Sequence, residues 1–249
     1  MTKWPRITDA TWGGSVAKVI AALLRHGDYH QLPDTPSALQ PFPLNPEGAE
    51  QAERSVTLIQ GILGMFKWAL HPVIDSSQLL RGWQTAEVIR KGLQIGASTP
   101  LIIESFDALA ERSVGSAGNL TVRQIEAVLQ EDPRFSQPPP GWKSDSHYRL
   151  PLQGAESLMD AGERVASHLD SRLAELAHQV EVDTVKLFVG HGAAFRHAAH
   201  HLGVLEFHQI AALSMYHCRP VFLERRYSGS WRHLTGEWKV RSKGEAFVD

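Results

Sequence analysis

Two short apolar runs, each followed at once by a histidine, stand out in the hydrophobic pattern of the chain. The first is Val19 to Leu24, six apolar residues in a row, and it ends in Arg25-His26-Gly27. The second covers 184–190 and ends in His191-Gly192. Continuous apolar runs of this length are typical of strands buried on both faces of a parallel sheet. Because ligands bind at the carboxyl ends of such strands, we expect the two imidazoles to meet if the strands are neighbours.

Helical and strand patterns alternate through most of the remaining sequence. Residues at helical spacing predict helices over 46–63, 79–93, 121–130, 156–177 and 193–202. Further strands are expected over 71–77, 101–103, 221–227 and 231–240, with 221–227 as an antiparallel edge. The alternation predicts an α/β fold: a single-domain, doubly wound, mostly parallel sheet with helices on both faces.

Two irregular segments interrupt this alternation, and both are expected near the Arg-His end of the sheet. Segment 28–46 is rich in proline, and segment 133–150 carries three consecutive prolines before Gly141. Long loops beside a strand's carboxyl end are often functional. Their polar and aromatic side chains are candidates for contact with a ligand, namely Tyr29, His30, Trp142, Lys143, His147, Tyr148 and Arg149. Alternatively, the aromatic residues of the second segment only pack it against the protein.

Length and composition indicate one domain with no polyanionic partner. At 249 residues the chain is long enough for one large α/β domain, and we expect residues 1–17 to form an N-terminal extension of a domain over 18–249. The formal net charge of −2 gives no general attraction to nucleic acid or to an anionic membrane. The apolar-rich stretch 56–70 is interrupted by polar residues, which favours a helix packed on the sheet over a membrane span. Oligomeric state is not indicated by the sequence.

Cys218 is the only cysteine of the chain, so neither an intrachain disulfide nor a multi-cysteine zinc site can form. This usage fits a reducing, cytoplasmic setting. His197 and His201 have the i, i+4 spacing of metal ligands on a helix, with His200 beside them. No acid or second ligand type accompanies them, so helix packing or solvation is the preferred interpretation. We therefore predict no metal and no cofactor.

Six ordered motifs give the chain a family resemblance. The motifs are Arg25-His26-Gly27, Leu44-x-x-x-Gly48-x-x-Gln51-Ala52, Ser77-x-Leu79-x-Arg81-x-x-Gln84-Thr85-Ala86, Leu109-x-Glu111-x-x-x-Gly115, Gly154-x-Glu156-Ser157 and Gly190-His191-Gly192-x-x-x-Arg196. In this order they resemble the histidine phosphatases, the superfamily that includes phosphoglycerate mutase. The resemblance covers roughly residues 18 to 205. It implies that 18–249 is a catalytic domain of the phosphoglycerate mutase-like type.

The resemblance assigns chemistry that these residue types can perform. Arg25 and Arg81 supply guanidinium forks for phosphate oxygens, and His191 adds a further donor. A neutral His26 attacks phosphorus through one ring nitrogen and forms a phosphohistidine. Glu111 protonates the leaving group and later activates water, with Glu104 and Asp107 as alternatives. Asp28 and Gly192 complete the expected substrate-binding set, although Asp28 is also explained as a solvated loop acid.

Departures from the mutase pattern favour hydrolysis. Leu32, Val114 and Ala193 stand where mutases carry polar substrate-holding residues, and Asp132-Pro133 lies about where they have an arginine pair. A mutase must retain a bisphosphate intermediate, so loss of these donors favours transfer to water. The predicted function is hydrolysis of a phosphomonoester, from a small molecule or a phosphoprotein, by a histidine acid-type phosphatase. The alternatives are a phosphoglycerate mutase-type phosphotransferase and an inactive binding or scaffold protein of the same fold.

Overall fold

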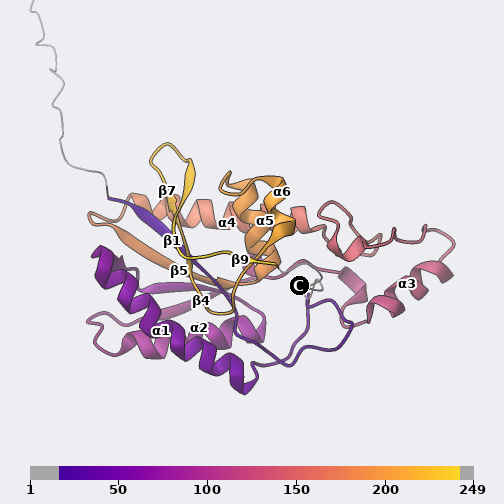
Figure 1. The fold of residues 1–249 in the computed structure, drawn as a ribbon, viewed down its shortest axis with the longest axis horizontal. Helices are drawn as coiled ribbons and strands as arrows, with labels where there is room; N and C mark the ends of the chain where they lie inside the picture. Colours follow the sequence, from indigo (N-terminus) through magenta and orange to yellow (C-terminus); the bar gives the residue numbers. More distant parts are fainter. Residues whose placement is uncertain (1–16, 242–249) are drawn as a thin grey trace, which may run out of the picture.

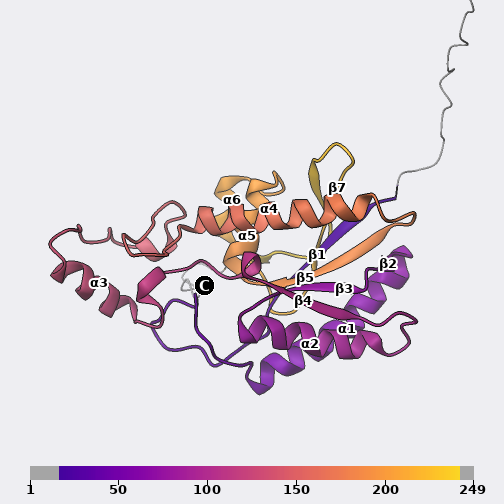
Figure 2. The same ribbon diagram turned by 180° about the vertical axis from the view of Figure 1, so that it is seen from behind.

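The computed structural model describes residues 17–241 as a mostly parallel sheet between two layers of helices (Figures 1 and 2). The strands are β1 (Val19–Arg25), β2 (Ala69–Leu70), β3 (Val73–Ser77), β4 (Ile102–Phe106), β5 (Thr184–Gly190), β6 (Leu213–Ser214), β7 (Val221–Arg225), β8 (Trp231–Thr235) and β9 (Lys239–Val240). The α-helices are α1 (Pro46–Phe66), α2 (Leu80–Gln94), α3 (Val122–Glu131), α4 (Leu158–Ala177), α5 (Gly192–His201) and α6 (Phe207–Ala212). Three short 3₁₀ turns complete the elements: η1 (Asp107–Leu109), η2 (Gly115–Ala117) and η3 (Trp142–Ser144).

The sheet has the strand order β4-β3-β5-β1-β7-β8, and β2 pairs with the start of β5. Strands β4, β3, β5 and β1 run parallel, whereas β7 and β8 are antiparallel additions on the far side of β1. The predicted α/β fold with a doubly wound, mostly parallel sheet is confirmed. Since β1 and β5 are central, their carboxyl ends meet in the middle of one sheet edge.

Alternate residues of β1 pack into two different hydrophobic cores. Val19, Ala21 and Leu23 pack with the apolar faces of α4 and α5 in one core. Ile20, Ala22 and Leu24 pack with α1 and α2 in the other. A strand that is apolar at every position can serve both layers, which explains why its pattern is continuous rather than alternating. In Figure 1, α1 and α2 accordingly lie on one side of the sheet and α4 and α5 on the other.

Local sequence signals place the helix starts. Asn45 caps α1, because its side-chain oxygen accepts from the Gly48 N–H at 2.8 Å and Pro46 occupies the first turn. Thr121 and Ser157 form capping boxes at the starts of α3 and α4. The predicted helices are therefore confirmed to within a few residues at each end.

Two expectations about the C-terminal strands were wrong. The strand over 221–227 is antiparallel as expected, but it is not an edge, because β8 pairs along its outer side. The strand expected over 231–240 is divided into β8 and β9, and β9 pairs with β6 in a separate small sheet. Gly236 causes the break: its φ is +87°, and a Cβ there would lie 2.3 Å from the Pro220 carbonyl oxygen.

The segment over 114–155 forms an outlying lobe with its own core, which includes Ile125, Leu129 and Trp142. It carries α3 and lies at one end of the molecule in Figure 1. The predicted extension over 1–17 lies outside the described residues except for its last position. Within the described part of the chain, no helix has the length and apolar composition needed to cross a membrane.

Candidate active site

The nucleophile candidate lies where β1 and β5 end side by side. Arg25 pairs with Gly190 in the parallel register, and the His26 N–H donates to the Gly190 carbonyl at 2.9 Å. The next residue on β5 is His191, so the two imidazole rings lie 4.9 Å apart between centroids. The predicted meeting of the two histidines is confirmed.

One hydrogen bond fixes the tautomer of His26. Its Nδ1 lies 2.7 Å from the Gly27 carbonyl oxygen, which can only accept, so Nδ1 carries the proton. Nε2 is then left with a lone pair, and the Arg81 Nε–H donates to it at 3.3 Å. Burial lowers the pKa of His26 well below its usual 6.5, and the charges of His191, Arg81 and Arg25 lower it further. His26 is therefore neutral at pH 7, with Nε2 facing the arginine.

The loop after His26 turns at the start of α1 through a close backbone contact. A Cβ on Gly27 would lie 2.4 Å from the Gly48 carbonyl oxygen, and one on Gly48 would lie 1.9 Å from the Asp28 carbonyl oxygen. The Thr85 hydroxyl also accepts from the Gly27 N–H at 3.0 Å. Both glycines are required because the chain could not otherwise pass this closely.

Arg81 joins the two histidines to the loop over 28–45. It lies in the first turn of α2, is fully buried, and its Nη2 reaches His191 Nδ1 at 3.3 Å. The same guanidinium donates to three backbone carbonyl oxygens of the loop, those of Ser37, Ala38 and Gln40, at 2.8 to 3.2 Å. The loop carbonyls thus hold the Arg81 guanidinium in place. They also occupy the positions in which phosphate oxygens could accept hydrogen bonds from it. His26 is only 3% exposed in this arrangement.

His191 is anchored by the end of β3. Its Nε2 lies 3.0 Å from the Ser77 hydroxyl, and because Arg81 can only donate, Nδ1 is the accepting nitrogen. Burial lowers its pKa well below 6.5, with Arg81 and Arg25 adding to the effect. In this structure His191 therefore orients Arg81.

Arg25 lies against Gly192 at the start of α5. A Cβ on Gly192 would lie 3.1 Å from Cδ of Arg25, so the glycine gives the arginine room to extend along the helix terminus. Nη1 of Arg25 donates to the Met215 carbonyl at 3.2 Å. Gly192 thus contributes space rather than a side-chain contact.

Glu111 is held beside the site by backbone N–H groups. Its Oε1 accepts from the N–H of Arg112 at 2.9 Å and from the N–H of Ala194, in the first turn of α5, at 3.2 Å. A space of about 10 Å³ lies between Glu111, Ser37 and Ala38, about enough for one water molecule. The carboxylate is therefore fixed next to a water-sized space.

The two alternative acids have other partners. Glu104 forms an ion pair with Arg172 at 2.6 Å, in a charged network between the sheet and α4. Asp107 begins η1, where its backbone carbonyl accepts from Arg164 at 3.1 Å. The geometry thus favours Glu111 over both. Asp28 accepts from the Asn45 side chain at 2.7 Å, an interaction that ties the loop to the cap of α1.

The segment over 133–150 is largely held by packing. Trp142 is 2% exposed, lies in the core of the outlying lobe and donates from Nε1 to Glu126 at 3.1 Å. The His147 ring stacks on Phe207 with centroids 5.3 Å apart. These contacts favour the alternative in which the aromatic residues hold the segment against the protein.

The histidines of α5 have protein partners. His197 is buried between the Ala193 carbonyl at 2.7 Å and the Ser146 hydroxyl at 3.0 Å, and burial lowers its pKa to about 4. His201 contacts the Met159 carbonyl at 3.0 Å. Among residues 17–241, no group of three or more His, Cys, Asp or Glu side chains is arranged to hold a metal.

Two neighbours of His26 acquire a role only in the structure. Nδ1 of His217 donates to the His26 carbonyl oxygen at 2.6 Å, and the two rings lie 5.6 Å apart. Tyr29, expected only as a ligand contact, packs edge-on against His26 and lies 4.5 Å from the Arg81 guanidinium carbon. Its hydroxyl is buried without a hydrogen-bond partner among the described residues. No sequence motif marks His217, because its partner is 191 positions away.

A comparison with protein families gives a match over most of the chain. Residues 21–235 match the model of the histidine phosphatase superfamily (branch 1). The chain belongs to this superfamily. A search of curated proteins found no match.

Solved structures show the same fold. A mycobacterial glucosyl-3-phosphoglycerate phosphatase is similar over 90% of this chain and 99% of its own, with a TM-score of 0.61 and 20% identity. An α-ribazole phosphatase from Shigella flexneri is similar over 89% of this chain and 96% of its own, with a TM-score of 0.62 and 19% identity. At these identities the likeness concerns the fold.

Proposed function

We propose that the protein is a phosphatase that hydrolyses a phosphomonoester through a phosphohistidine on His26. Membership of the superfamily supports phosphatase activity in general. The observation that carries the proposal is the state of His26: neutral, protonated at Nδ1, with Nε2 facing Arg81. An imidazole in this state is a nucleophile, and the adjacent guanidinium stabilises the charge that develops on phosphorus oxygens.

The proposed reaction has two steps. First, Nε2 of His26 attacks phosphorus, the bond to the leaving oxygen breaks, and that oxygen takes a proton from Glu111. Second, Glu111 removes a proton from water, the resulting hydroxide attacks phosphorus, and the N–P bond breaks to release phosphate. Arg25 and Arg81 hold the phosphoryl oxygens in both steps, which requires Arg81 to exchange its carbonyl partners for phosphate, while His191 keeps Arg81 oriented.

Hydrolysis is favoured over mutase activity by the apolar positions around the site. Val114 and Ala193 are each 1% exposed, and neither side chain can hold a substrate oxygen. Asp132 pairs with its neighbour Arg134 at 2.6 Å. Water therefore has few competitors for the phosphohistidine. With one buried free cysteine in the described chain, we place the enzyme in the cytoplasm.

Turnover of para-nitrophenyl phosphate, followed by alkaline quench and mass spectrometry, tests the proposal. We expect phosphate release and one phosphoryl group on the peptide that contains His26. His26→Ala should lose both, with kcat reduced about 10³-fold or more, because no other group of the site replaces the nucleophile. His178→Ala, which removes an exposed histidine after α4, is the matched control.

Other outcomes select the alternatives. Transfer of the phosphoryl group to the second hydroxyl of a diol phosphate, in preference to water, would identify a mutase. A folded protein that neither releases phosphate nor becomes phosphorylated would be a binding protein.

A further inference from the structure

The histidine that was expected to donate to the phosphoryl group has other partners in the structure. Charge in the transition state spreads over three phosphoryl oxygens, and Arg25 and Arg81 are the donors proposed for them. His191 was expected to add a further donor, but its Nδ1 accepts from Arg81 at 3.3 Å and its Nε2 lies 3.0 Å from the Ser77 hydroxyl. A further donor to these oxygens therefore has to come from another residue.

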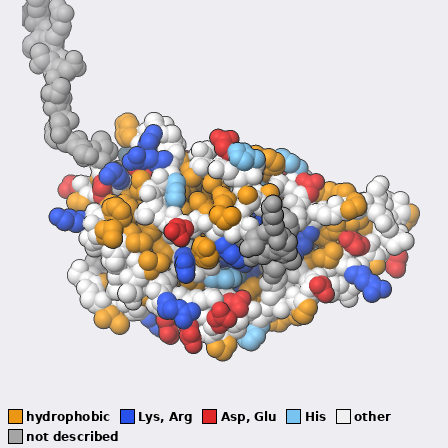
Figure 3. Space-filling view, in the orientation of Figure 1, with side chains coloured by type: hydrophobic (Ala, Val, Ile, Leu, Met, Phe, Trp, Pro, Cys, Tyr) orange, Lys and Arg blue, Asp and Glu red, His pale blue; other side chains and the backbone are white. Residues whose placement is uncertain are grey.

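The positive charge at the site already balances that of a phosphate ester. Two guanidiniums match the two negative charges of a phosphomonoester dianion. The formal net charge of the chain is −2, yet Figure 3 shows Lys, Arg and His side chains close together near the middle of one face of the molecule. An uncharged donor would therefore add a hydrogen bond without adding excess charge.

Tyr29 is a buried donor without an acceptor. Its side chain is 5% exposed, and its hydroxyl has no hydrogen-bond partner among the described residues. Buried hydroxyls almost always form a hydrogen bond, because loss of their interactions with water would otherwise destabilise the fold. The hydroxyl of Tyr29 is thus available to a bound ligand.

Tyr29 contacts both the nucleophile and the arginine that faces it. Its ring packs edge-on against His26, with centroids 5.3 Å apart and planes at 84°. The guanidinium carbon of Arg81 lies 4.5 Å from the centre of the Tyr29 ring. A phosphoryl group that His26 attacks and Arg81 holds must therefore lie beside Tyr29.

The surroundings of Tyr29 keep its hydroxyl protonated. Burial raises its pKa to about 12, and the charges of Glu111 and Asp28 raise it further, against the lowering effect of Arg81 and Arg25. The hydroxyl therefore keeps its proton at neutral pH and can donate a hydrogen bond. Protonation of the leaving group remains with Glu111.

The backbone around Tyr29 is attached to the start of α1. The Asp28 N–H donates to the Gln51 side chain at 2.9 Å, and Tyr29 forms an isolated antiparallel bridge with Leu44. The carbonyl groups that hold the arginine belong to residues 37–40, farther along the loop. The arginine can therefore exchange these carbonyls for phosphate while the tyrosine keeps its position.

We propose that the Tyr29 hydroxyl donates a hydrogen bond to an oxygen of the phosphoryl group that His26 attacks. The inference rests on the proposed function, because it requires the phosphate ester to lie at His26. The hydrogen bond strengthens as charge develops on that oxygen, and the proton stays on Tyr29 in both steps. Tyr29 is then a catalytic residue that contacts the phosphoryl group and not the leaving group.

Tyr29→Phe removes the hydroxyl and keeps the ring that packs on His26 and Arg81. We expect kcat/KM for para-nitrophenyl phosphate to fall about tenfold or more. The inhibition constant for vanadate, an analogue of the transferring phosphoryl group, should rise by a similar factor. The urea midpoint should not fall, because the hydroxyl has no partner to lose in the folded protein.

Two substrates locate the contact of the hydroxyl. A hydrogen bond to a phosphoryl oxygen should lower the single-turnover rate by the same factor for para-nitrophenyl phosphate and for an alkyl phosphate, because both carry the same phosphoryl group. A larger loss on the alkyl phosphate would place the hydroxyl at the leaving oxygen and overturn the assignment.

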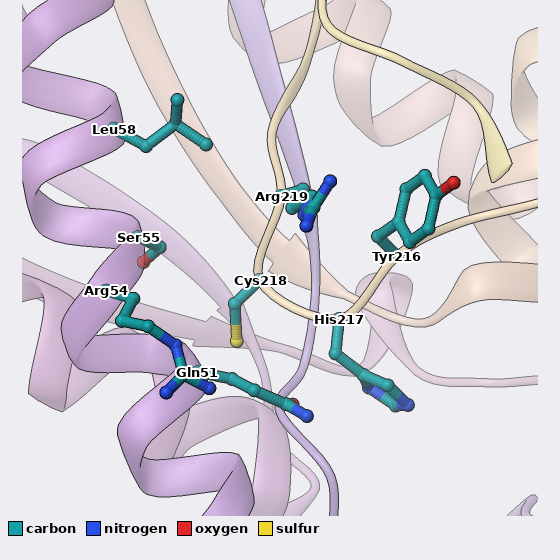
Figure 4. Close-up of a pocket in the computed structure, with 8 residues that line it drawn as sticks. All are labelled: Gln51, Arg54, Ser55, Leu58, Tyr216, His217, Cys218 and Arg219. Atoms are coloured by element: carbon teal, nitrogen blue, oxygen red, sulfur yellow. The ribbon is translucent and has the colours of Figure 1, made fainter.

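Tyr216→Phe is the matched control. Tyr216 also packs against an arginine, with the Arg219 guanidinium carbon 4.7 Å from its ring centre. It lines a hollow between α1 and the segment 216–219, whose lining does not include Tyr29, and in Figure 4 its hydroxyl points away from the ring of His217. Removal of this hydroxyl should leave kcat/KM and vanadate inhibition unchanged.

The remaining outcomes separate this inference from the proposed function. Unchanged kcat/KM in Tyr29→Phe, or equal losses in Tyr29→Phe and Tyr216→Phe, would overturn the inference and leave the phosphatase proposal standing. A lower urea midpoint for Tyr29→Phe would also overturn it, because the hydroxyl would then have a partner within the folded protein. Absence of phosphate release by the wild-type protein from every substrate would overturn both proposals.

Discussion

At the scale of single residues, His26 owes its chemical state to neighbours from several distant segments. The Gly27 carbonyl fixes the tautomer, Arg81 contacts Nε2, and the backbone of Gly190 holds the residue at the end of β1. Burial and the surrounding cations keep the imidazole neutral. The proposed nucleophile is thus neutral, with its tautomer fixed, before any substrate binds.

Glu111 is the proposed proton donor to the leaving group. The loss of rate caused by removing its carboxylate should therefore depend on how much the leaving group needs a proton. Glu111→Gln should slow hydrolysis of an alkyl phosphate about 10²-fold or more, because an alkoxide must be protonated as it departs. Release of para-nitrophenolate needs no proton, so that substrate should lose much less in the phosphorylation step. Single-turnover kinetics with both substrates measure this difference.

One control variant and one contrary outcome test this role of Glu111. Glu104→Gln removes a carboxylate that pairs with Arg172, so it should not change the leaving-group dependence. Equal losses on both substrates after Glu111→Gln would instead indicate that Glu111 serves to position the start of α5, where it accepts from the Ala194 N–H.

From the sequence alone, Arg25, His26 and His191 could be placed together. Side chains that follow neighbouring parallel strands meet at one edge of the sheet, and these three residues stand at the ends of two such strands. Arg81 and Glu111 were chosen from motif resemblance. His217 could not be found, since it lies in a segment without periodicity and its contact with His26 is made through a backbone carbonyl. Only the folded chain shows that its ring lies beside that of His26.

At the scale of elements, the loop over 28–45 is organised from within by Gln40. This side chain is fully buried, accepts from the Leu32 N–H at 2.9 Å and donates to the Pro36 carbonyl at 3.0 Å. Its own carbonyl is one of the three that hold Arg81. The proline content predicted an irregular loop, but it gave no sign that carbonyl groups of this loop accept from Arg81.

Gln40→Ala should loosen the loop and weaken the site together. The lost hydrogen bonds should speed amide exchange in the peptide 28–45 about tenfold or more, and the looser Arg81 should raise the inhibition constant for vanadate. Hydrogen exchange and inhibition assays measure the two effects. Gln31→Ala is the control, because its side chain makes only a 3.5 Å contact with Thr35. Unchanged exchange and inhibition would mean that the loop is held without Gln40.

Element boundaries were predicted best where local chemistry determines them. The Asn45-Pro46 start of α1 follows from capping rules alone. The end of α1 was expected three residues early, because the helix continues to Phe66 and stops at Lys67, whose φ is +56°. Lysine gives no signal for this left-handed conformation, which is more typical of glycine.

At the scale of the whole molecule, alternation of strand and helix patterns predicted the fold class, whereas strand order depends on contacts between distant residues. The antiparallel pair β7 and β8 extends the sheet beyond β1, and no local pattern distinguishes an edge from an inner strand. The same addition brings the segment 216–219 against α1.

A buried ion network connects the sheet to α4 and should make stability depend on pH. Asp75 of β3 is fully buried and contacts Lys186 of β5 at 2.7 Å, Arg172 of α4 at 2.8 Å and His168 of α4 at 2.9 Å. Burial alone would raise the pKa of Asp75, but hydrogen bonds from His168, Arg172 and Lys186 outweigh it and lower the pKa. A lowered pKa means that Asp75 stabilises the fold above its unfolded pKa of about 3.9 and that this contribution is lost as the pH falls through its folded pKa.

Asp75→Asn should therefore lower the free energy of unfolding by about 3–5 kcal/mol at pH 7, because Lys186 would remain buried without its carboxylate. Urea denaturation of both proteins from pH 7 down to pH 3 measures the effect, and the difference between them should shrink at the acid end. The control is Asp132→Asn, in an exposed pair with Arg134, which should leave the midpoint unchanged. A difference between wild type and Asp75→Asn that stays constant down to pH 3 would show that packing of the side chain, and not its charge, connects β3 to α4.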